Sequence, residues 1–487
     1  MAGPRATQGV RNKGLTACAD AAVQKIRNPN LEARNKHEAR ISKMVLVRAN
    51  VLMAQYKPFR ISIFDFVSDF GIRISILAAV AVVLLAKSVA AANNWPQFRG
   101  PNGDGLSDAV GLPITFGESE NLRWKTPIHG KGWSSPVVWG KQIWLTTATD
   151  DGTEMFAVCV DLDSGKVTRD IKLWDSHPNP QFFNPKNSYA TPTPVVEEGR
   201  VYVHFGSFGT AAIDTASGER LWTRQDLPCN HYRGPASSPI LVDNLLVLTF
   251  DGFDLNYLAA LDKRTGETVW RRDRNIQYDT DNGDYHKAFS TPKVIEVSGR
   301  RELVSPSAGA TAAYDPASGD ELWRVRSGGA NAATPPLFGN GLVYCTTALG
   351  GWQLFAMRPG GSGDVTATHV AWKMNKAVPT RPAPILLDDL LFMVSDNSVA
   401  SCLDAKSGTP LWQHRFGGDF SASPVSAGGR IYFFDEGGGV QVIEARREFA
   451  QVATNRLEAG CMASPAIVGR SLIVRTKTDL YRFELAQ

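Results

Sequence analysis

Basic, aromatic and amide side chains gather in several loops of the chain, and this mixture suits the binding of an anionic or hydrogen-bonding ligand. Each loop ends just before a proline that opens an apolar segment. Function concentrates on loops that a rigid scaffold holds in place, but single polar residues in loops are more often simply solvated. The candidate ligand-binding residues are His129, Lys131, Trp133, Asn187, Tyr189, His231, Arg233, His286, Lys287 and Arg381.

Catalytic and metal-binding patterns are not recognised in the sequence. There is no G-x-S-x-G, H-E-x-x-H or P-loop pattern. The segment YDTDNGDYH (278–286) alternates carboxylates like a calcium loop, but it lacks the glycine and terminal glutamate positions of an EF-hand, so we expect an ordinary turn. The five cysteines after residue 92 show no CxxC or CxxCH spacing. We therefore assign no metal site, and the catalytic residues stay unassigned.

A repeat organises most of the chain and must position these loops. A proline followed by an apolar segment recurs about every 47 residues, at Pro136, Pro194, Pro239, Pro292, Pro336, Pro384, Pro424 and Pro465. Each unit has apolar segments and turn residues for four short strands. Four-stranded units repeated every 40–50 residues or so are typical of β-propellers. We therefore predict an all-β fold, an eight-bladed propeller over residues 121–487.

The two ends of the repeat indicate how the ring closes. After Pro465 the chain has room for only three strands. The missing strand is predicted at residues 121–126, where Trp124 lies twelve residues before the first repeat proline. Trp372 and Trp412 likewise lie twelve residues before the repeat prolines that follow them. An N-terminal strand in the last blade would remove the exposed sheet edges that a β-protein must protect.

The segment LAALDKRTGETVW (258–270) contains a motif that several units share. Asp262 can accept hydrogen bonds in a tight turn, and Gly266 can take a positive φ. The tryptophans at the motif's end are expected to pack between blades; they lie at positions 124, 174, 222, 270, 323, 372 and 412, with Leu457 in their place in the seventh unit. These residues specify a fold, so we expect no catalytic role for the turn aspartates.

The motif A-x-D-x-x-S/T-G-x-x-x-W resembles the tryptophan-docking repeat of the quinoprotein-like (PQQ-like) β-propellers, a family that includes PQQ-dependent alcohol dehydrogenases and BamB. The segment WPQFRGPNGDG (95–105) further resembles exported members of the family from planctomycetes. An enzyme of this family would need PQQ with calcium, but the adjacent cysteine pair of the methanol-type enzymes is absent. We therefore favour a monomeric binding scaffold for a protein, a glycan or a small anion. A PQQ-dependent dehydrogenase acting on alcohols or sugars is the alternative.

The N-terminal part of the chain differs from the repeats. Residues 1–92 carry a net charge of +9, which leaves a net charge of −5 for residues 93–487. Because this larger part of the chain is mildly acidic, nucleic-acid binding is not expected. Arg73, the apolar run 74–86 and the small residues 88–92 predict a signal peptide at 71–92. The run is too short to be a permanent membrane span. Residues 1–70 are predicted to be a mis-assigned or disordered extension and 93–120 a lead-in segment of an exported, periplasmic or extracellular protein.

Overall fold

The computed structural model describes residues 94–177, 183–351 and 353–486. The chain divides into two compact units, Met1–Ala79 and Val80–Gln487, and all described residues belong to the second. The predicted N-terminal extension and signal peptide lie outside the described residues. In the part that is described, no helix is long and apolar enough to cross a membrane.

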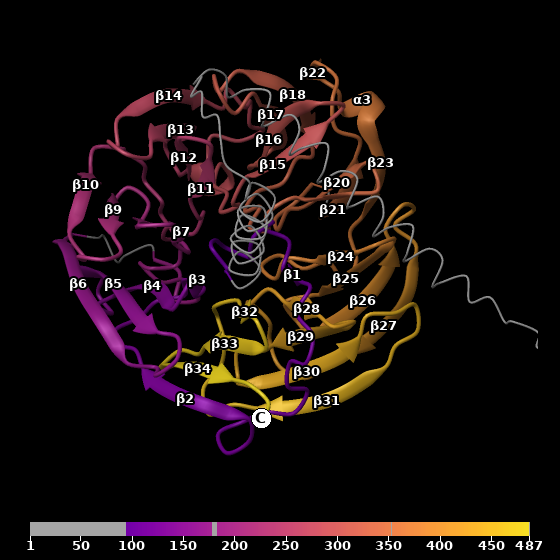
Figure 1. Cartoon of the computed structure of the whole chain (residues 1–487). Helices are drawn as coiled ribbons and strands as arrows, with labels where there is room; N and C mark the ends of the chain where they lie inside the picture. The colour runs from indigo at the N-terminus through magenta and orange to yellow at the C-terminus, as the bar shows by residue number, and fades with distance from the viewer. Residues whose placement is uncertain (1–93, 178–182, 352, 487) are drawn as a thin grey trace, which may run out of the picture. The chain divides into compact units, whose positions relative to one another are not determined.

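Eight sheets of antiparallel strands form the blades of a β-propeller (Figure 1). Blade 1 contains β3 (Val137–Trp139), β4 (Gln142–Ala148), β5 (Glu154–Asp161) and β6 (Val167–Asp175). Blade 2 contains β7 (Val195–Glu197), β8 (Arg200–His204), β9 (Thr210–Asp214) and β10 (Arg220–Arg224). Blade 3 contains β11 (Ile240–Val242), β12 (Leu245–Asp251), β13 (Asn256–Asp262) and β14 (Thr268–Asp273). Blade 4 contains β15 (Lys293–Val297), β16 (Arg300–Pro306), β17 (Ala310–Tyr314) and β18 (Glu321–Arg326).

The second half of the ring repeats this arrangement. Blade 5 contains β19 (Leu337–Gly339), β20 (Leu342–Thr346), β21 (Leu354–Met357) and β23 (Val370–Met374). Blade 6 contains β24 (Ile385–Leu387), β25 (Leu390–Val394), β26 (Val399–Asp404) and β27 (Pro410–Arg415). Blade 7 contains β28 (Val425–Ala427), β29 (Arg430–Phe434), β30 (Gly439–Glu444) and β31 (Gln451–Arg456). Blade 8 contains β32 (Ala466–Val468), β33 (Ser471–Arg475), β34 (Asp479–Phe483) and β2 (Leu122–Pro127).

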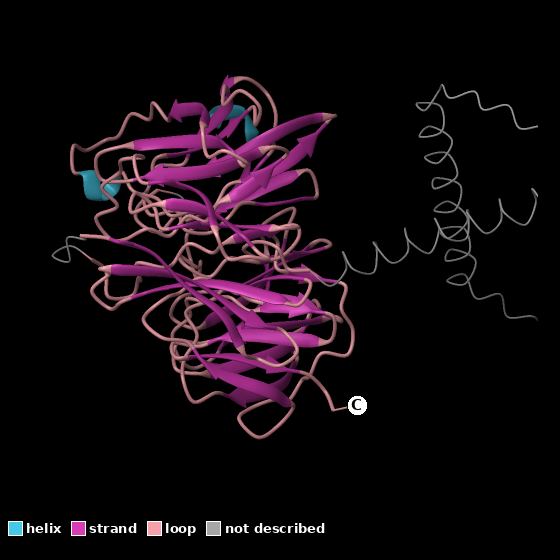
Figure 2. Cartoon of the chain, turned by 60° about the vertical axis from the view of Figure 1, so that its left-hand side comes forward, coloured by secondary structure: helices cyan, strands magenta, loops and turns pink. Residues whose placement is uncertain are grey.

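Four short elements lie outside this pattern, two of them helical, and Figure 2 shows that strands and loops make up the rest of the described part. The 3₁₀-helix η2 (Gly283–Tyr285) precedes blade 4, and the helix α3 (Thr366–His369) precedes β23. Strand β22 (Gly363–Asp364) pairs in parallel with β18, and strand β1 (Leu106–Ser107) pairs in parallel with β28. The prediction of an all-β, eight-bladed propeller is confirmed, and each of the eight repeat prolines directly precedes the first strand of a blade.

The N-terminal strand closes the ring as predicted. β2 pairs antiparallel with β34, and Trp124 lies opposite Arg482 in this pairing. Figure 1 shows the indigo β2 beside the yellow β34 at the bottom of the view. Blade 8 therefore combines strands from the two ends of the propeller.

The shared turn motif joins each blade that carries it to its neighbour. In the turn after β13, Asp262 accepts two backbone N–H groups, and Gly266 has a φ of +77°. The ring of Trp222 from blade 2 lies over this glycine, so closely that an added Cβ would come within 2.7 Å of it. The indole N–H of Trp222 also donates to the carbonyl oxygen of Lys263 at 3.1 Å. Glycine is thus required both for its backbone conformation and for the space it leaves.

Blade 7 departs from the prediction that Leu457 takes the tryptophan position. The strand register places Ala453 opposite Val442, in the position that tryptophan holds in six other blades, whereas Leu457 follows the end of β31. The prediction was wrong because it sought a large apolar residue instead of keeping the twelve-residue spacing. The prediction for Trp174 in blade 1 was also wrong, because Arg169 takes this position opposite Cys159 and Trp174 lies opposite Met155. Phe116 of the lead-in segment packs against blades 7 and 8, with its ring centroid 6.4 Å from that of Phe434 and 4.8 Å from that of Phe483.

Candidate binding site

The loops that precede the first strands converge on a central cavity of about 570 Å³, to which all eight blades contribute lining residues. Five of the ten candidate residues line it: Trp133, Asn187, Arg233, Lys287 and Arg381. Their binding of a ligand stays a prediction. The volume lies within the range of small-molecule sites, about 300–1,000 Å³.

A belt of hydrogen bonds holds the cavity wall, and it is formed by the residues just before the repeat prolines. In six blades the backbone N–H of this residue donates to the side-chain hydroxyl of the corresponding residue in the next blade, at 2.9–3.0 Å. The belt runs from Ala383 through Ser423, Ser464, Ser135, Thr193 and Ser238 to Thr291. It breaks at Pro335, because proline has neither an N–H nor a hydroxyl group. The wall is therefore rigid around most of its circumference.

The lead-in segment forms the floor of the cavity. Its N-terminal end pairs with the middle of β3, where Trp95 and Val138 exchange backbone hydrogen bonds of 2.9 and 2.8 Å. On the far side of the ring, the buried guanidinium of Arg99 donates to the carbonyl oxygens of Ala383 at 3.3 Å and Pro384 at 2.6 Å. Between these anchors Phe98 lines the cavity. In Figure 1 this indigo segment runs through the middle of the ring to β1.

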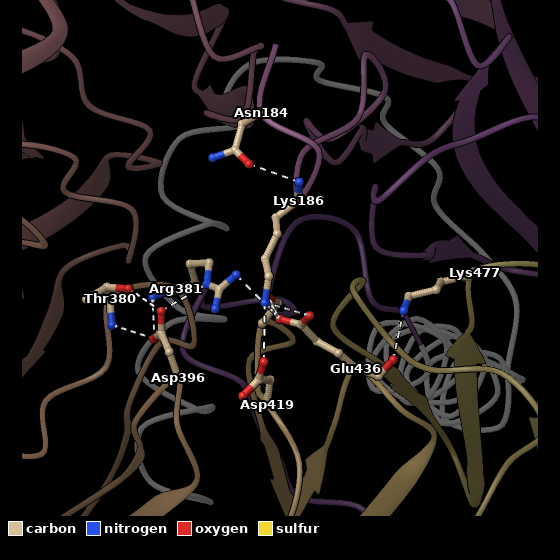
Figure 3. Close-up of polar contacts among 9 residues, drawn as sticks. Asn184, Lys186, Thr380, Arg381, Asp396, Asp419, Glu436 and Lys477 are labelled. Atoms are coloured by element: carbon tan, nitrogen blue, oxygen red, sulfur yellow. Dashed lines mark hydrogen bonds and ion pairs between the residues drawn. The ribbon is translucent and has the colours of Figure 1, made fainter. Parts of the chain in front are cut away.

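A cluster of charged side chains occupies the blade 6–7 side of the cavity (Figure 3). Arg381 donates from Nε to Asp396 at 2.9 Å and lies 3.4 Å from Glu436. Lys186, from the loop before blade 2, reaches the same carboxylate of Glu436 at 3.1 Å and Asp419 at 3.4 Å. Lys186 therefore connects blade 2 to blade 7. These five side chains comprise three carboxylates and two cations.

A second ion-paired group lies on the blade 3–4 side. Arg233 donates to Asp284 at 3.0 Å, and Lys287 pairs with the same carboxylate and donates to the Asp284 carbonyl oxygen at 2.8 Å. Burial, together with the nearby charge of Arg233, lowers the pKa of Lys287 to about 8. Each lysine or arginine of the cavity lining thus already has a carboxylate partner. The lining has mixed charge, in contrast to the basic funnel that the sequence suggested, and an anionic ligand would have to compete with these carboxylates.

Two polar atoms of the lining residues lack a hydrogen-bond partner within the described part of the chain. They are the indole N–H of Trp133 on blade 1 and the side-chain carbonyl oxygen of Asn331 before blade 5, and both atoms are buried. Buried polar groups are normally satisfied. The walls of this cavity therefore contain one donor and one acceptor that the described residues leave unpaired.

The other five candidate residues lie outside the central cavity. Lys131 lies over the ring of Trp133, 5.5 Å from its centroid, but does not line the cavity.

The other four of these residues have aromatic rings with partners outside the central cavity. The imidazole of His129 is 3.0 Å from Asp170 and packs edge-on against Phe156. His286 stacks on Tyr278 within its own loop, with ring centroids 3.9 Å apart. Tyr189 and His231 line a second cavity. Each of these four histidine and tyrosine rings is held by local packing that the loop sequence did not reveal.

Three contributors to the central site were missed at the sequence level. Asp396 and Glu436 lie in the hairpins between the second and third strands of blades 6 and 7, and Phe98 lies in the lead-in segment. Asp396 and Phe98 line the cavity, and Glu436 pairs with the lining residues Lys186 and Arg381. The sequence prediction rests on the loops before the first strands, whereas the hairpins between the second and third strands of blades 6 and 7 reach the same side of the ring.

The ring nitrogen of His231 has a structural role. Its Nε2 accepts the backbone N–H of Ser207 at 2.9 Å, and burial lowers the pKa of His231 to about 4. Nearby in blade 2, His204 is buried against Phe250, and desolvation lowers the pKa of its imidazole to about 3. Both histidines are therefore neutral at pH 7.

Acidification is expected to destabilise the protein through His204. Because the pKa of this imidazole is near 3 when folded and near 6.5 when unfolded, the unfolded chain binds a proton first as the pH falls. Below pH 6.5 or so the free energy of unfolding should drop by up to about 1.4 kcal/mol per pH unit from this group. Urea denaturation at several pH values should show a shallower slope for His204→Asn, and an unchanged slope would contradict this assignment.

Metal ligands do not cluster in the described residues. No group of three or more His, Cys, Asp and Glu side chains there could hold a metal ion. The carboxylates at the central cavity are instead ion-paired with lysine and arginine side chains.

Known proteins match this chain through its repeats. The model of the family described as outer membrane protein assembly factor BamB matches residues 117–272 and 361–486, more than half of the chain. The chain belongs to this family of PQQ-like β-propeller proteins. The tetrathionate hydrolase of Acidithiobacillus ferrooxidans is 24% identical over 268 residues, half of each chain. BamB of Kangiella koreensis is 30% identical over 138 residues, 28% of this chain and 29% of that protein. The match thus spans half or less of these two relatives.

Solved structures show the same fold at low sequence identity. BamB from Moraxella catarrhalis aligns with a TM-score of 0.53 and 13% identity, over 74% of this chain and 99% of that structure. The quinohemoprotein alcohol dehydrogenase of Comamonas testosteroni aligns with a TM-score of 0.57 and 11% identity, over 83% of this chain and 82% of that one. The fold alone therefore does not separate a scaffold from an enzyme.

Proposed function

We propose that this protein is an exported binding scaffold that captures a polar segment of a partner protein at its loop-bearing face. The observation that carries the proposal is the central cavity, which all eight blades line and which the lead-in segment floors. Its mixed charges suit a peptide, which offers both signs of charge. A glycan or a small anion is the other ligand class for the same cavity. The BamB relatives are named as outer membrane protein assembly factors, which supports a protein partner.

A PQQ-dependent dehydrogenase is the second candidate. The likeness to the quinohemoprotein alcohol dehydrogenase and to a europium-containing methanol dehydrogenase favours it. Such an enzyme needs ligands for a metal ion beside the quinone. Asp284, Asp396 and Glu436 are each engaged by lysine or arginine, and the described residues offer no three-ligand cluster. The donor set present does not fit calcium-bound PQQ.

Site-specific photo-crosslinking in the native host tests the scaffold proposal. A photoreactive residue at Leu349, which lines the cavity and is 45% exposed, should cross-link to a discrete protein. The matched control is Val269, which is 54% exposed on the fourth strand of blade 3. Lys186→Ala combined with Arg381→Ala should remove the cross-link at Leu349. Equal cross-linking from Val269, or none from Leu349, would overturn the proposal.

Export is part of the same proposal, and it predicts a defined mature N-terminus. Cleavage after the small residues 88–92 should give a secreted chain that starts between Ala91 and Asn94. Edman sequencing or mass spectrometry of the protein from its native host checks this. A mature chain that begins before Gly71 would contradict it. We also expect the secreted chain to be a monomer.

A further inference from the structure

A second cavity of about 440 Å³ lies beside the central one, between the loops that lead to blades 2 and 3. Five aromatic rings line it: Phe183, Tyr189, Phe208, Tyr232 and Phe253. We call it the aromatic cavity. It is separate from the central cavity because their sets of lining residues do not overlap.

The rings of the aromatic cavity are held in place by packing. Phe183 stacks on Tyr189 with centroids 4.1 Å apart, and Phe208 meets Tyr189 edge-on at 5.8 Å. An added Cβ at Gly234 would come within 2.6 Å of Phe183. On the other side, Tyr232 and Phe253 lie 4.9 Å apart. The cavity is therefore a preformed aromatic enclosure.

The chemistry of this lining differs from that of the central cavity. Among the described residues, none of the side chains that line it belongs to Asp, Glu, Lys or Arg. Neutral polar groups are present instead: the amide of Asn230, the hydroxyl of Ser207 and the imidazole of His231. The hydroxyl of Tyr189 makes no hydrogen bond to another described residue. Arg233 and Lys287 lie over the ring of Tyr232, 4.6 and 5.1 Å from its centroid, but both are already paired with Asp284. A charged ligand would therefore lose its hydration here without gaining an unpaired partner of opposite charge.

We propose that the aromatic cavity binds a neutral sugar ring. A pyranose presents C–H faces that pack against aromatic rings, and its hydroxyl groups both donate and accept hydrogen bonds. The lining offers both kinds of surface, and its volume suits one small ligand. A purely apolar side chain from a partner would leave the amide and hydroxyl groups unpaired, which costs binding free energy. This site does not depend on what the central cavity binds.

Saturation-transfer NMR and calorimetry with neutral trisaccharides of glucose and of N-acetylglucosamine test the proposal on the secreted chain. We expect saturable binding of at least one probe. Phe253→Leu keeps an apolar side chain but removes the aromatic face, and should weaken binding about tenfold. Tyr189→Phe removes only a hydroxyl group and should weaken it about threefold to tenfold.

Phe156→Ala is the matched control, because this ring lies at the rim beside His129 and lines neither cavity. It should leave sugar binding unchanged. If Phe253→Leu lowers the melting temperature strongly, Tyr189→Phe, which retains the ring, decides. No saturable binding of either probe would overturn the proposal, as would equal loss in Phe156→Ala or unchanged binding in Tyr189→Phe.

Discussion

Replacing Asp251 by alanine is expected to lower the free energy of unfolding by about 3–5 kcal/mol, because it leaves a buried guanidinium without its counter-ion. Arg274 donates to both carboxylate oxygens of Asp251, at 2.6 and 2.8 Å, and both side chains are fully buried. Arg274 also donates to the hydroxyl of Ser305 in blade 4, at 2.8 Å. The pair thus connects blade 3 to blade 4. Urea denaturation measures the loss.

A surface ion pair between the same two blades provides the control. Arg301 and Asp243 are 2.7 Å apart but remain largely exposed. Exposed pairs contribute little to stability, so Arg301→Ala should leave the denaturation midpoint nearly unchanged. Replacing both Asp251 and Arg274, by leucine and methionine, should recover much of the loss of the single variant. If Asp251→Ala were tolerated as well as Arg301→Ala, the buried pair would not have the role we assign to it.

Removing the residues before Ile128 from the propeller is expected to abolish its cooperative folding. The truncation deletes β2, which pairs with β34 along its length, and leaves a long exposed edge in blade 8. It also removes Trp124, whose indole N–H donates to Leu162 of blade 1 at 2.9 Å. A domain of this kind is stable by only about 5–15 kcal/mol, and one whole strand with its interface exceeds that margin. Urea denaturation and gel filtration should show loss of the transition and aggregation.

A chain that begins at Gly117 serves as the control for this truncation. It keeps β2 but lacks the floor segment that contains Phe98 and Arg99. We expect it to unfold cooperatively at a lower urea concentration than the longer chain. If the chain beginning at Ile128 had the same midpoint as the one beginning at Gly117, β2 would not close the ring in solution.

The fold could be predicted because its determinants are local and repeated. A proline before each first strand, an aspartate and a glycine in the turn and a tryptophan at fixed spacing recur along the chain, so an irregular unit does not obscure the count. Leu457 shows the limit of this approach. Its side chain is buried and apolar, but the strand register gives the tryptophan position to Ala453.

The candidate site was predicted less completely, because side-chain direction depends on tertiary contacts. Arg233 and Lys287 turn into the cavity, where they share Asp284, whereas His286, next to Lys287 in sequence, stacks on Tyr278. Nothing in the loop sequence distinguishes these neighbours. The partner of Lys186 is Glu436, 250 residues later in the chain, and such a pair becomes visible only when the ring is closed.

A titration with PQQ in the presence of calcium tests most directly whether this propeller is a scaffold and not a quinoprotein. The purified secreted chain would be titrated while the quinone absorbance is followed, and then assayed for dye reduction with alcohols and sugars. Because the carboxylates of the central cavity are engaged by lysine and arginine, we predict no saturable absorbance change and no dye reduction. Saturable binding of PQQ together with alcohol-dependent or sugar-dependent dye reduction would contradict the scaffold proposal.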